Sequence, residues 1–181
     1  GFYILGGLLR NLLKTDHPLA FSASIAFEQS YGGIDGDSAS GAEMVCLLSA
    51  MTKIPLRQDL AMTGAIDQLG NIQPIGAVSE KVEGFYEVCR DIGLTGKQGV
   101  VIPRANVGDL MLNPELLEVC AASKFHVYAI DTIQEALQLF TDSTVGEANA
   151  EGNYPAETLL NLAKARAQEF WKMANPRGRR D

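Results

Sequence analysis

A serine and a lysine, 43 positions apart, could together cleave an acyl bond. Ser38 ends the glycine-rich, acidic segment YGGIDGDS at residues 31–38 and opens a predicted helix. Lys81 lies in the first turn of another predicted helix. A serine becomes a nucleophile when a base reaches its hydroxyl, and a lysine serves as that base in Ser-Lys variants of the catalytic triad. The alternative is that neither residue is catalytic: Ser38 would be a serine at the start of a helix and Lys81 a surface lysine. Both interpretations are open at this point.

Lys81 can act as a base only in its neutral form. A free lysine has a pKa of about 10.4, so holding one neutral at pH 7 requires roughly 4.6 kcal/mol. The apolar residues 75–78 before Lys81 and the positive end of its helix both disfavour the ammonium form, and burial would add to this. Four carboxylates could instead pair with the lysine and keep it protonated and inert, and these are Glu80, Glu83, Asp35 and Asp37.

Other hydrolytic schemes fit the sequence less well. Residues 36–40, GDSAS, lack the final glycine of the G-x-S-x-G elbow. Only His17 and His126 could complete a Ser-His-Asp triad, and His126 lies in an apolar strand pattern typical of a core histidine. The sequence contains no S-x-x-K, H-E-x-x-H or P-loop motif. We therefore expect neither a metal nor a cofactor in this chain.

Composition predicts a cytoplasmic globular protein. The chain has 181 residues, 46% of them hydrophobic and 20% charged. Its net charge of −7 disfavours a nucleic-acid partner. Cys46, Cys89 and Cys120 are scattered and form no C-x-x-C pair, which indicates reduced thiols buried in the core. No apolar run approaches the roughly 20 residues of a membrane span, and no signal peptide is evident.

Hydrophobic periodicity and turn residues predict mixed helices and strands, and hence an α+β or α/β fold. Helices are predicted over residues 2–13, 38–51, 79–92, 114–122, 132–140 and 156–174, with Asp37 and Asp131 as N-caps of the second and fifth. Strands are predicted over residues 21–27, 60–66, 72–74, 99–102 and 126–130, with a hairpin turn at 69–72.

The chain is expected to divide into three parts. Residues 146–155 are poor in apolar side chains and rich in Gly, Asn and Glu, which predicts a linker. The main domain then covers residues 1–145, and a terminal helix with a basic tail covers 156–181. The first helix begins at the chain end, so we expect an N-terminal edge that is cut short.

Four motifs in order resemble the proteolytic domain of Lon proteases, most closely the Lon B-type and bacterial Lon-related branch. These are EQSYGG at 28–33 with DGDSA at 35–39, AMTG at 61–64 and PIGAVSEK at 74–81. The likeness continues through GVVIPRAN at 99–106 to about residue 140, or some three quarters of the chain. It implies an α+β fold of the ribosomal protein S5 domain 2-like type, with mixed sheets packed against helices.

The resemblance also implies roles for five residues. Ser38 is the expected nucleophile and Lys81 the general base of a serine endopeptidase that hydrolyses unfolded or regulatory proteins. Thr63 is expected to hydrogen-bond and orient the lysine. Asp35 and Asp37 match acidic positions that approach the lysine in some relatives and could hold a resting, inactive geometry.

Lon-type peptidases act on polypeptides as hexameric rings driven by a fused AAA+ ATPase. That ATPase, which would bind ATP and Mg²⁺, is absent from this chain, so we expect an excised protease domain. The family commonly has two glycines before the lysine, whereas here Gly76 is followed by Ala77.

Two further hypotheses are open. The chain could be a catalytically silent module for ring assembly or binding, as in bacterial DNA-repair proteins that carry such a domain, although Ser38, Lys81 and Thr63 together argue against this. It could also hold a competent dyad that is trapped inactive without the ATPase. A short distance between the serine hydroxyl and the lysine amine favours competence, whereas pairing of Lys81 with Asp35 or Asp37 favours the trapped state.

Overall fold

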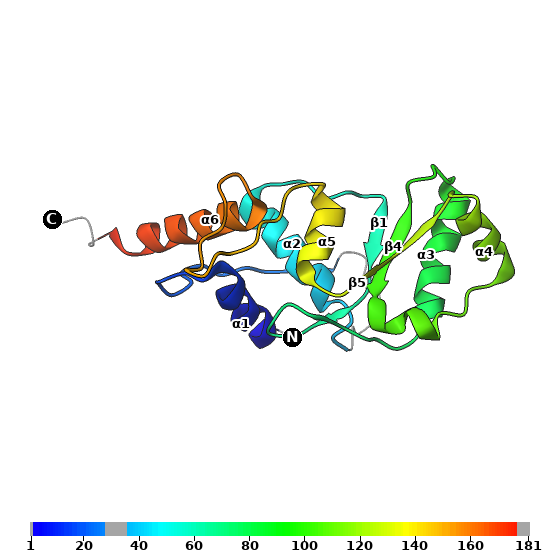
Figure 1. Cartoon of the computed structure of the whole chain (residues 1–181), viewed down its shortest axis with the longest axis horizontal. Coiled ribbons are helices and arrows are strands. Elements are labelled where there is room, and N and C mark those ends of the chain that lie inside the picture. Colours follow the sequence, from blue (N-terminus) through cyan, green and yellow to red (C-terminus); the bar gives the residue numbers. More distant parts are fainter. Residues whose placement is uncertain (1, 28–35, 177–181) are drawn as a thin grey trace.

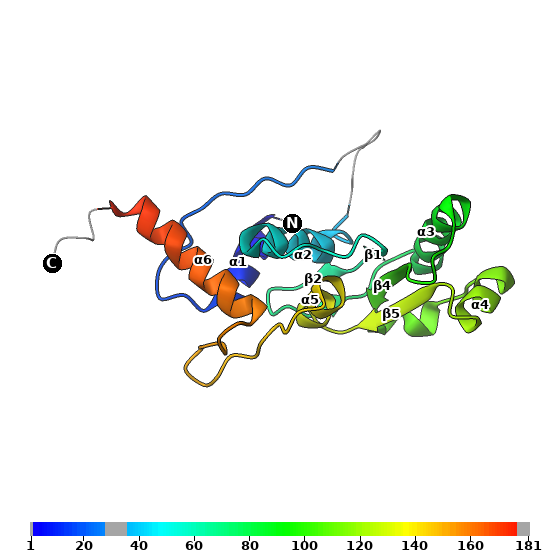
Figure 2. The same ribbon diagram turned by 90° about the horizontal axis from the view of Figure 1, so that it is seen from above.

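A three-stranded parallel sheet separates two groups of helices in the computed structural model, which describes residues 2–27 and 36–176 (Figures 1 and 2). The strand order is β1-β4-β5. The strands are β1 (Leu60–Met62), β4 (Gly99–Pro103) and β5 (His126–Ile130). The register pairs Leu60 with Gly99 and Gly99 with His126. The chain therefore has a mixed α+β architecture.

The central strand β4 is buried along its whole length because helices cover both faces of the sheet. Val101 packs into one hydrophobic core with Leu60 and Ile130. Val100 and Ile102 point to the opposite side and pack into a second core. This alternation follows from the two-residue period of a strand, and an all-apolar strand is typical of a parallel sheet covered on both faces.

The first core lies among four helices. They are α1 (Phe2–Leu13), α2 (Ser40–Thr52), α5 (Ile133–Thr141) and α6 (Leu159–Ala174). Leu8, Leu48, Leu137 and Leu160, one from each helix, are fully buried there. The C-terminal helix α6 packs on α1 and α2, so it docks on the same core. The division into parts at residues 146–155 stays a prediction.

The second core lies on the other face of the sheet, between β4 and two helices. These are α3 (Val78–Ile92) and α4 (Pro114–Ala121), with the short 3-10 helix η1 (Arg104–Asp109) after β4. Phe125 is fully buried in this core. Its ring packs edge-to-face with that of Tyr86, with the ring centroids 5.4 Å apart. Helix α2, which follows Ser38, thus packs into the first core, and helix α3, which carries Lys81, packs into the second core on the other face of the sheet (Figure 1).

A small antiparallel hairpin completes the fold and confirms the predicted turn at 69–72. Its strands are β2 (Ala65–Ile66) and β3 (Ile72–Gln73). The predicted strand over 60–66 is wrong as a single element, because it breaks between β1 and β2 at Thr63 and Gly64. The backbone N–H of Gly64 leaves the sheet and donates to the carbonyl of Ser38 instead.

The predicted strand over residues 21–27 is wrong: this segment is irregular. Phe21 and Ile25 do pack against the first core, which explains their alternation, but Phe27 is 46% exposed. A strand also needs a backbone partner, and no described strand lies beside this segment. The apolar alternation therefore reflects the packing of side chains against the core, not the hydrogen-bond ladder of a β-sheet.

The two predicted aspartate caps are also wrong. Helix α2 begins at Ser40, and its N-cap residue, Ala39, makes no side-chain cap hydrogen bond. Helix α5 is capped by Thr132, which forms a reciprocal capping box with Glu135. Of the three cysteines, Cys89 is buried and Cys120 is half-buried, and burial raises the pKa of both thiols, whereas Cys46 is exposed, contrary to expectation.

Among the described residues, no helix combines the length and the apolar composition needed to cross a lipid bilayer.

A close backbone approach fixes α2 against the end of β1 and gives the first prediction. A Cβ at Gly41 would lie 2.6 Å from the side chain of Met62 and 2.9 Å from the carbonyl oxygen of Gly64. We expect Gly41→Ala to lower the free energy of unfolding by about 1–3 kcal/mol. Gly84→Ala, in open space on α3, is the matched control and should raise it by up to about 1 kcal/mol. Chemical denaturation of both variants checks this, and equal effects would contradict the packing.

Candidate active site

The structure brings together the two residues singled out by sequence. The Nζ atom of Lys81 lies 3.1 Å from the Oγ atom of Ser38, and a hydrogen bond joins them. In the ammonium form Nζ donates to Oγ; in the neutral form, which a base requires, the serine hydroxyl donates to Nζ. Ser38 is half-buried and Lys81 is exposed. The pair therefore has the contact that general-base activation needs.

The turn that presents Ser38 is held by Ser40, the next serine in the chain. Gly36 opens the turn with φ +91°, a conformation that favours glycine. Ser40 is 4% exposed, and its hydroxyl donates to the carbonyl of Asp37 at 2.7 Å while accepting from the N–H of Ile66 at 3.0 Å. Sequence reasoning missed Ser40, which ties the serine turn to the β2–β3 hairpin. Its position directly after the motif was the only signal.

The carbonyl of Ser38 is anchored to the end of β1. It accepts from the N–H of Gly64 at 2.8 Å and, over a longer 3.4 Å, from the hydroxyl of Thr63. Thr63 itself is buried, and its N–H donates to Val101 at 3.0 Å, which continues the pairing of β1 with β4. The expected hydrogen bond from Thr63 to Lys81 is not seen among the described residues. Thr63 holds the backbone of Ser38 instead.

Lys81 is carried by the first turn of α3. Its N–H donates to the carbonyl of Ala77 at 3.1 Å, which starts the helix. Val78 and Val82 are buried in the second core and fix the helix, while the Lys81 side chain leaves the core toward Ser38. Burial of Lys81 is not seen, because its side chain lies beside the buried stripe of Val78 and Val82 and is exposed, as are Gly76 and Ala77 before it.

The described acidic neighbours of Lys81 form no ion pair with it: among residues 2–27 and 36–176, no carboxylate pairs with this lysine. Asp37 is exposed, and Glu83 is engaged elsewhere, since it accepts from the N–H of Asn113 at 2.7 Å. Asp35 lies outside the described residues, so its expected approach to Lys81 stays a prediction.

A polar link on the far side of α3 holds the lysine's helix to α4. The hydroxyl of Tyr86 donates to Glu115 at 2.8 Å, and the guanidinium of Arg90 approaches the same carboxylate at 3.4 Å. These hydrogen bonds lower the pKa of Glu115, and the bond to Glu115 raises the pKa of Tyr86. Because the pKa of Glu115 is lower in the folded chain than in the unfolded one, the link stabilises the fold fully above the unfolded pKa, and this stabilisation is lost as the pH falls through the lowered, folded pKa.

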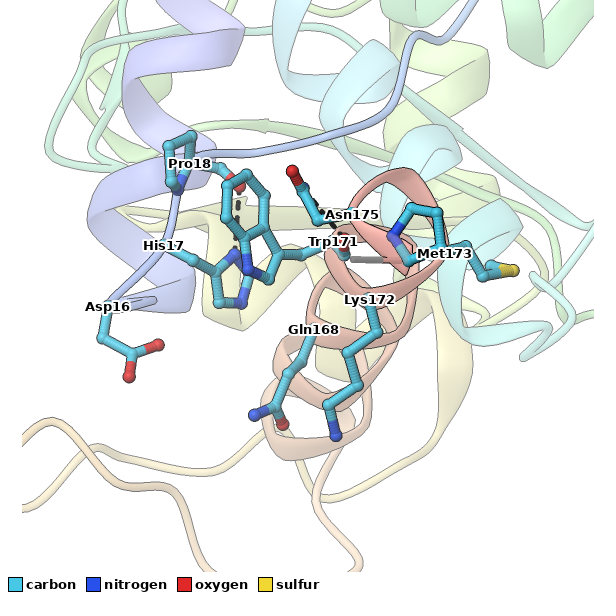
Figure 3. A pocket seen from close by; sticks show the side chains of 9 residues that line it. Asp16, His17, Pro18, Gln168, Trp171, Lys172, Met173 and Asn175 are labelled. Carbon is cyan, nitrogen blue, oxygen red and sulfur yellow. Dashed lines mark hydrogen bonds between the residues drawn. The ribbon is translucent and has the colours of Figure 1, made fainter. Parts of the chain in front are cut away.

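Neither histidine joins Ser38. The ring of His126 lies 2.9 Å from the carbonyl of Gly96. His17 stacks on Trp171 with ring centroids 5.5 Å apart, and its Nδ1 lies 3.0 Å from the carbonyl of Pro18 (Figure 3). That pair lines a cavity of about 930 Å³ beside the end of α6, which contains none of the site residues. A Ser-His-Asp triad is therefore not formed by the described residues.

No metal centre competes with this interpretation in the part of the chain that the structure describes. Residues 2–27 and 36–176 hold no group of three or more His, Cys, Asp or Glu side chains arranged to bind an ion.

Comparison with known families decides the assignment. The model of the Lon protease (S16) C-terminal proteolytic domain matches residues 27–141. The chain belongs to the Lon protease family. The matched span contains Ser38, Thr63 and Lys81, so the Lon resemblance seen in the motifs is confirmed.

Three relatives illustrate the range of similarity to this Lon domain. A protein of Escherichia coli K12 named "Putative Lon protease homolog" is 46% identical over 77% of the chain. Its counterpart of the same name from Haemophilus influenzae is 39% identical over 93%, and an archaeal Lon protease of Thermococcus kodakarensis is 35% identical over 66%. The chain spans 24%, 28% and 17% of these three proteins, respectively.

The loop before Lys81 yields a prediction about backbone strain. Ala77 has φ +57° and ψ +40°, a left-handed conformation that costs a non-glycine residue about 1–2 kcal/mol. Ala77→Gly should therefore raise the free energy of unfolding by about 0.5–1 kcal/mol, as measured by urea denaturation. Ala165→Gly, at an exposed position within α6, should lower it by about 1 kcal/mol. The same sign for both changes would contradict the strain at Ala77.

Proposed function

We propose that this chain is the proteolytic part of a Lon-type serine endopeptidase, with Ser38 as nucleophile and Lys81 as general base. The observation that carries the proposal is the 3.1 Å contact between Oγ of Ser38 and Nζ of Lys81. Family membership supports it, since a Lon proteolytic domain implies polypeptide substrates. The backbone anchors of Ser38 support it further, because they hold the nucleophile within reach of the amine before substrate arrives.

The reaction proceeds through an acyl-enzyme. Neutral Lys81 takes the hydroxyl proton as Oγ of Ser38 attacks the scissile carbonyl carbon and forms a tetrahedral intermediate. Lys81 then gives that proton to the leaving amine as the peptide C–N bond breaks. In the second half, Lys81 takes a proton from water, which attacks the ester, and returns it to Ser38 when the acyl group leaves as a carboxylic acid.

The serine turn supplies the groups for the developing oxyanion. The backbone N–H groups of Ser38 and Ala39 are the donors we assign to this role, and neither is bonded to an acceptor among the described residues. Donors that are already aimed at the oxyanion lower the barrier because they need no reorganisation during the reaction. Asp37, whose carbonyl is occupied by Ser40, shapes this turn.

The remaining proposals concern the whole protein. We assign the fold to the ribosomal protein S5 domain 2-like type and the location to the cytoplasm. The protein acts on unfolded or regulatory polypeptides as a hexameric ring. An AAA+ ATPase outside this chain uses ATP and Mg²⁺, and the chain itself needs no cofactor.

A second candidate is a competent dyad held in a resting state, and one observation favours it. Lys81 is exposed, so water reaches the amine that contacts Ser38. On this account the dyad is assembled but open to solvent, and closure of the site over a bound polypeptide activates it by excluding water. Such a chain cleaves peptides slowly until a polypeptide covers the site.

Cleavage of a casein-like unfolded substrate by purified chain tests the dyad. We expect Ser38→Ala and Lys81→Met each to lower the rate at least about 10³-fold, because either change removes a member of the reacting pair. Ser24→Ala and Lys124→Met, at exposed positions, are the matched controls and should retain the rate. Circular dichroism should show the same fold in all four variants. Retained cleavage in either dyad variant, or an inactive wild type at every pH tested, would contradict the proposal.

A further inference from the structure

We propose that Asn106 is a positioning residue that holds Lys81 within reach of Ser38. The proposal rests on the proposed function and adds a residue to which sequence reasoning gave no role. Asn106 lies in η1, directly after the central strand β4, and is 3% exposed. It contacts neither the serine nor the lysine in any described hydrogen bond, so it acts through the backbone that carries Lys81.

The carboxamide of Asn106 hydrogen-bonds both the N–H and the carbonyl of Ile75. Its Oδ1 accepts from the N–H of Ile75 at 2.9 Å, and its Nδ2 donates to the carbonyl of Ile75 at 3.0 Å. A second bond from Nδ2, to Asp109 at 3.3 Å, fixes the orientation of the amide. The side chain thus imitates an antiparallel strand partner for Ile75. An aspartate of the same shape would lack the donor, and an alanine would lack both groups.

The backbone of Ile75 leads into the helix that carries Lys81, so fixing Ile75 helps to fix Lys81. Residues 74–77 lie between β3 and α3 and have no regular structure. Among the described side chains, Asn106 is the only one that hydrogen-bonds the backbone of this connection. Ala77 then turns through its left-handed conformation into α3, and Lys81 follows in the first helical turn. A shift at Ile75 therefore passes to Lys81 through a short segment in which Gly76 and Ala77 are exposed.

Packing holds this segment on one side only. The side chain of Ile75 packs against the second core, whereas Gly76 and Ala77 are exposed and an open pocket of about 540 Å³ lies beside the segment. The hydrogen bonds from Asn106 therefore fix the direction of a stretch of backbone that packing contacts only in part. Two further bonds join α3 to the segment after η1, from Met111 to Ser79 at 2.9 Å and from Asn113 to Glu83 at 2.7 Å. They secure the helix itself, whereas Asn106 secures the approach to it.

The test measures the rate at which a fluorophosphonate reagent modifies Ser38, with and without Lys81. We expect Asn106→Ala to slow modification about 10- to 100-fold, since a displacement near 1 Å can cost 10²-fold in a positioned pair. In the Lys81→Met background the same change should alter the rate by less than about twofold, because there is no amine left to position. A purely structural role would lower both rates by the same factor.

Asn113→Ala is the matched control. It removes another asparagine that hydrogen-bonds a backbone N–H, that of Leu116 at the start of α4, and should lower stability but leave the modification rate unchanged. If Asn106→Ala does not fold, Asp109→Ala takes its place. Asp109 is exposed, and its loss frees the Asn106 amide. We expect a smaller fall in rate, again only when Lys81 is present.

The outcomes separate this inference from the proposed function. A wild-type rate in Asn106→Ala, or an equal fall in the Lys81→Met background, would overturn the role of Asn106 and leave the dyad intact. Ser38 that is modified equally fast in wild type and Lys81→Met would overturn the dyad itself. A fall in rate that depends on Lys81, and that Asn113→Ala does not share, would support the proposal.

Discussion

The candidate site depends on the backbone of Gly64. Its N–H donates to the carbonyl of Ser38, and its carbonyl accepts from the N–H of Gly41 in the first turn of α2. These two bonds lie where β1 ends and join the serine turn to the sheet. A side chain on either glycine would clash, with Met62 at Gly41 and with Ile72 at Gly64. Ser38 is therefore placed by contacts between main chains, which a flexible loop could not provide alone.

The serine and the lysine come from opposite sides of the sheet. Helix α2 packs into the first core and helix α3 into the second, so only the sheet and its connections relate them (Figure 1). The 3.1 Å contact then requires each helix to begin at the correct place. Gly64 and Ser40 fix the start of α2, while Ile75 and Ala77 lead into α3. The contact between Ser38 and Lys81 thus depends on where two helices begin as well as on the two side chains.

Much of this arrangement is predictable from local sequence. The order of the motifs around Ser38, Thr63 and Lys81 indicates a Ser-Lys site, and hydrophobic periodicity predicts α3, β4 and β5 closely. These signals are local, since a helix stripe or a buried strand is written in neighbouring residues. The mixed α+β class follows from the same pattern.

What failed depends on contacts between distant segments. The partner of Thr63 could not be foreseen because the chain turns at Gly64 to meet Ser38. The exposure of Lys81 depends on which face of α3 the second core takes. The alternation in residues 21–27 predicts a strand, yet a strand exists only if another lies beside it. Asn106 ends the motif at residues 99–106, but its role could not be predicted because Ile75, the residue that it binds, is 31 positions away.

Activation of Ser38 by Lys81 underlies the proposed mechanism. It can be measured by mass spectrometry and peptide mapping of the chain after treatment with a serine-directed phosphonate. We expect a single adduct on Ser38 in the folded wild type and its near absence in Lys81→Met under the same conditions. An adduct on another serine, or equal modification of Ser38 in both proteins, would contradict it.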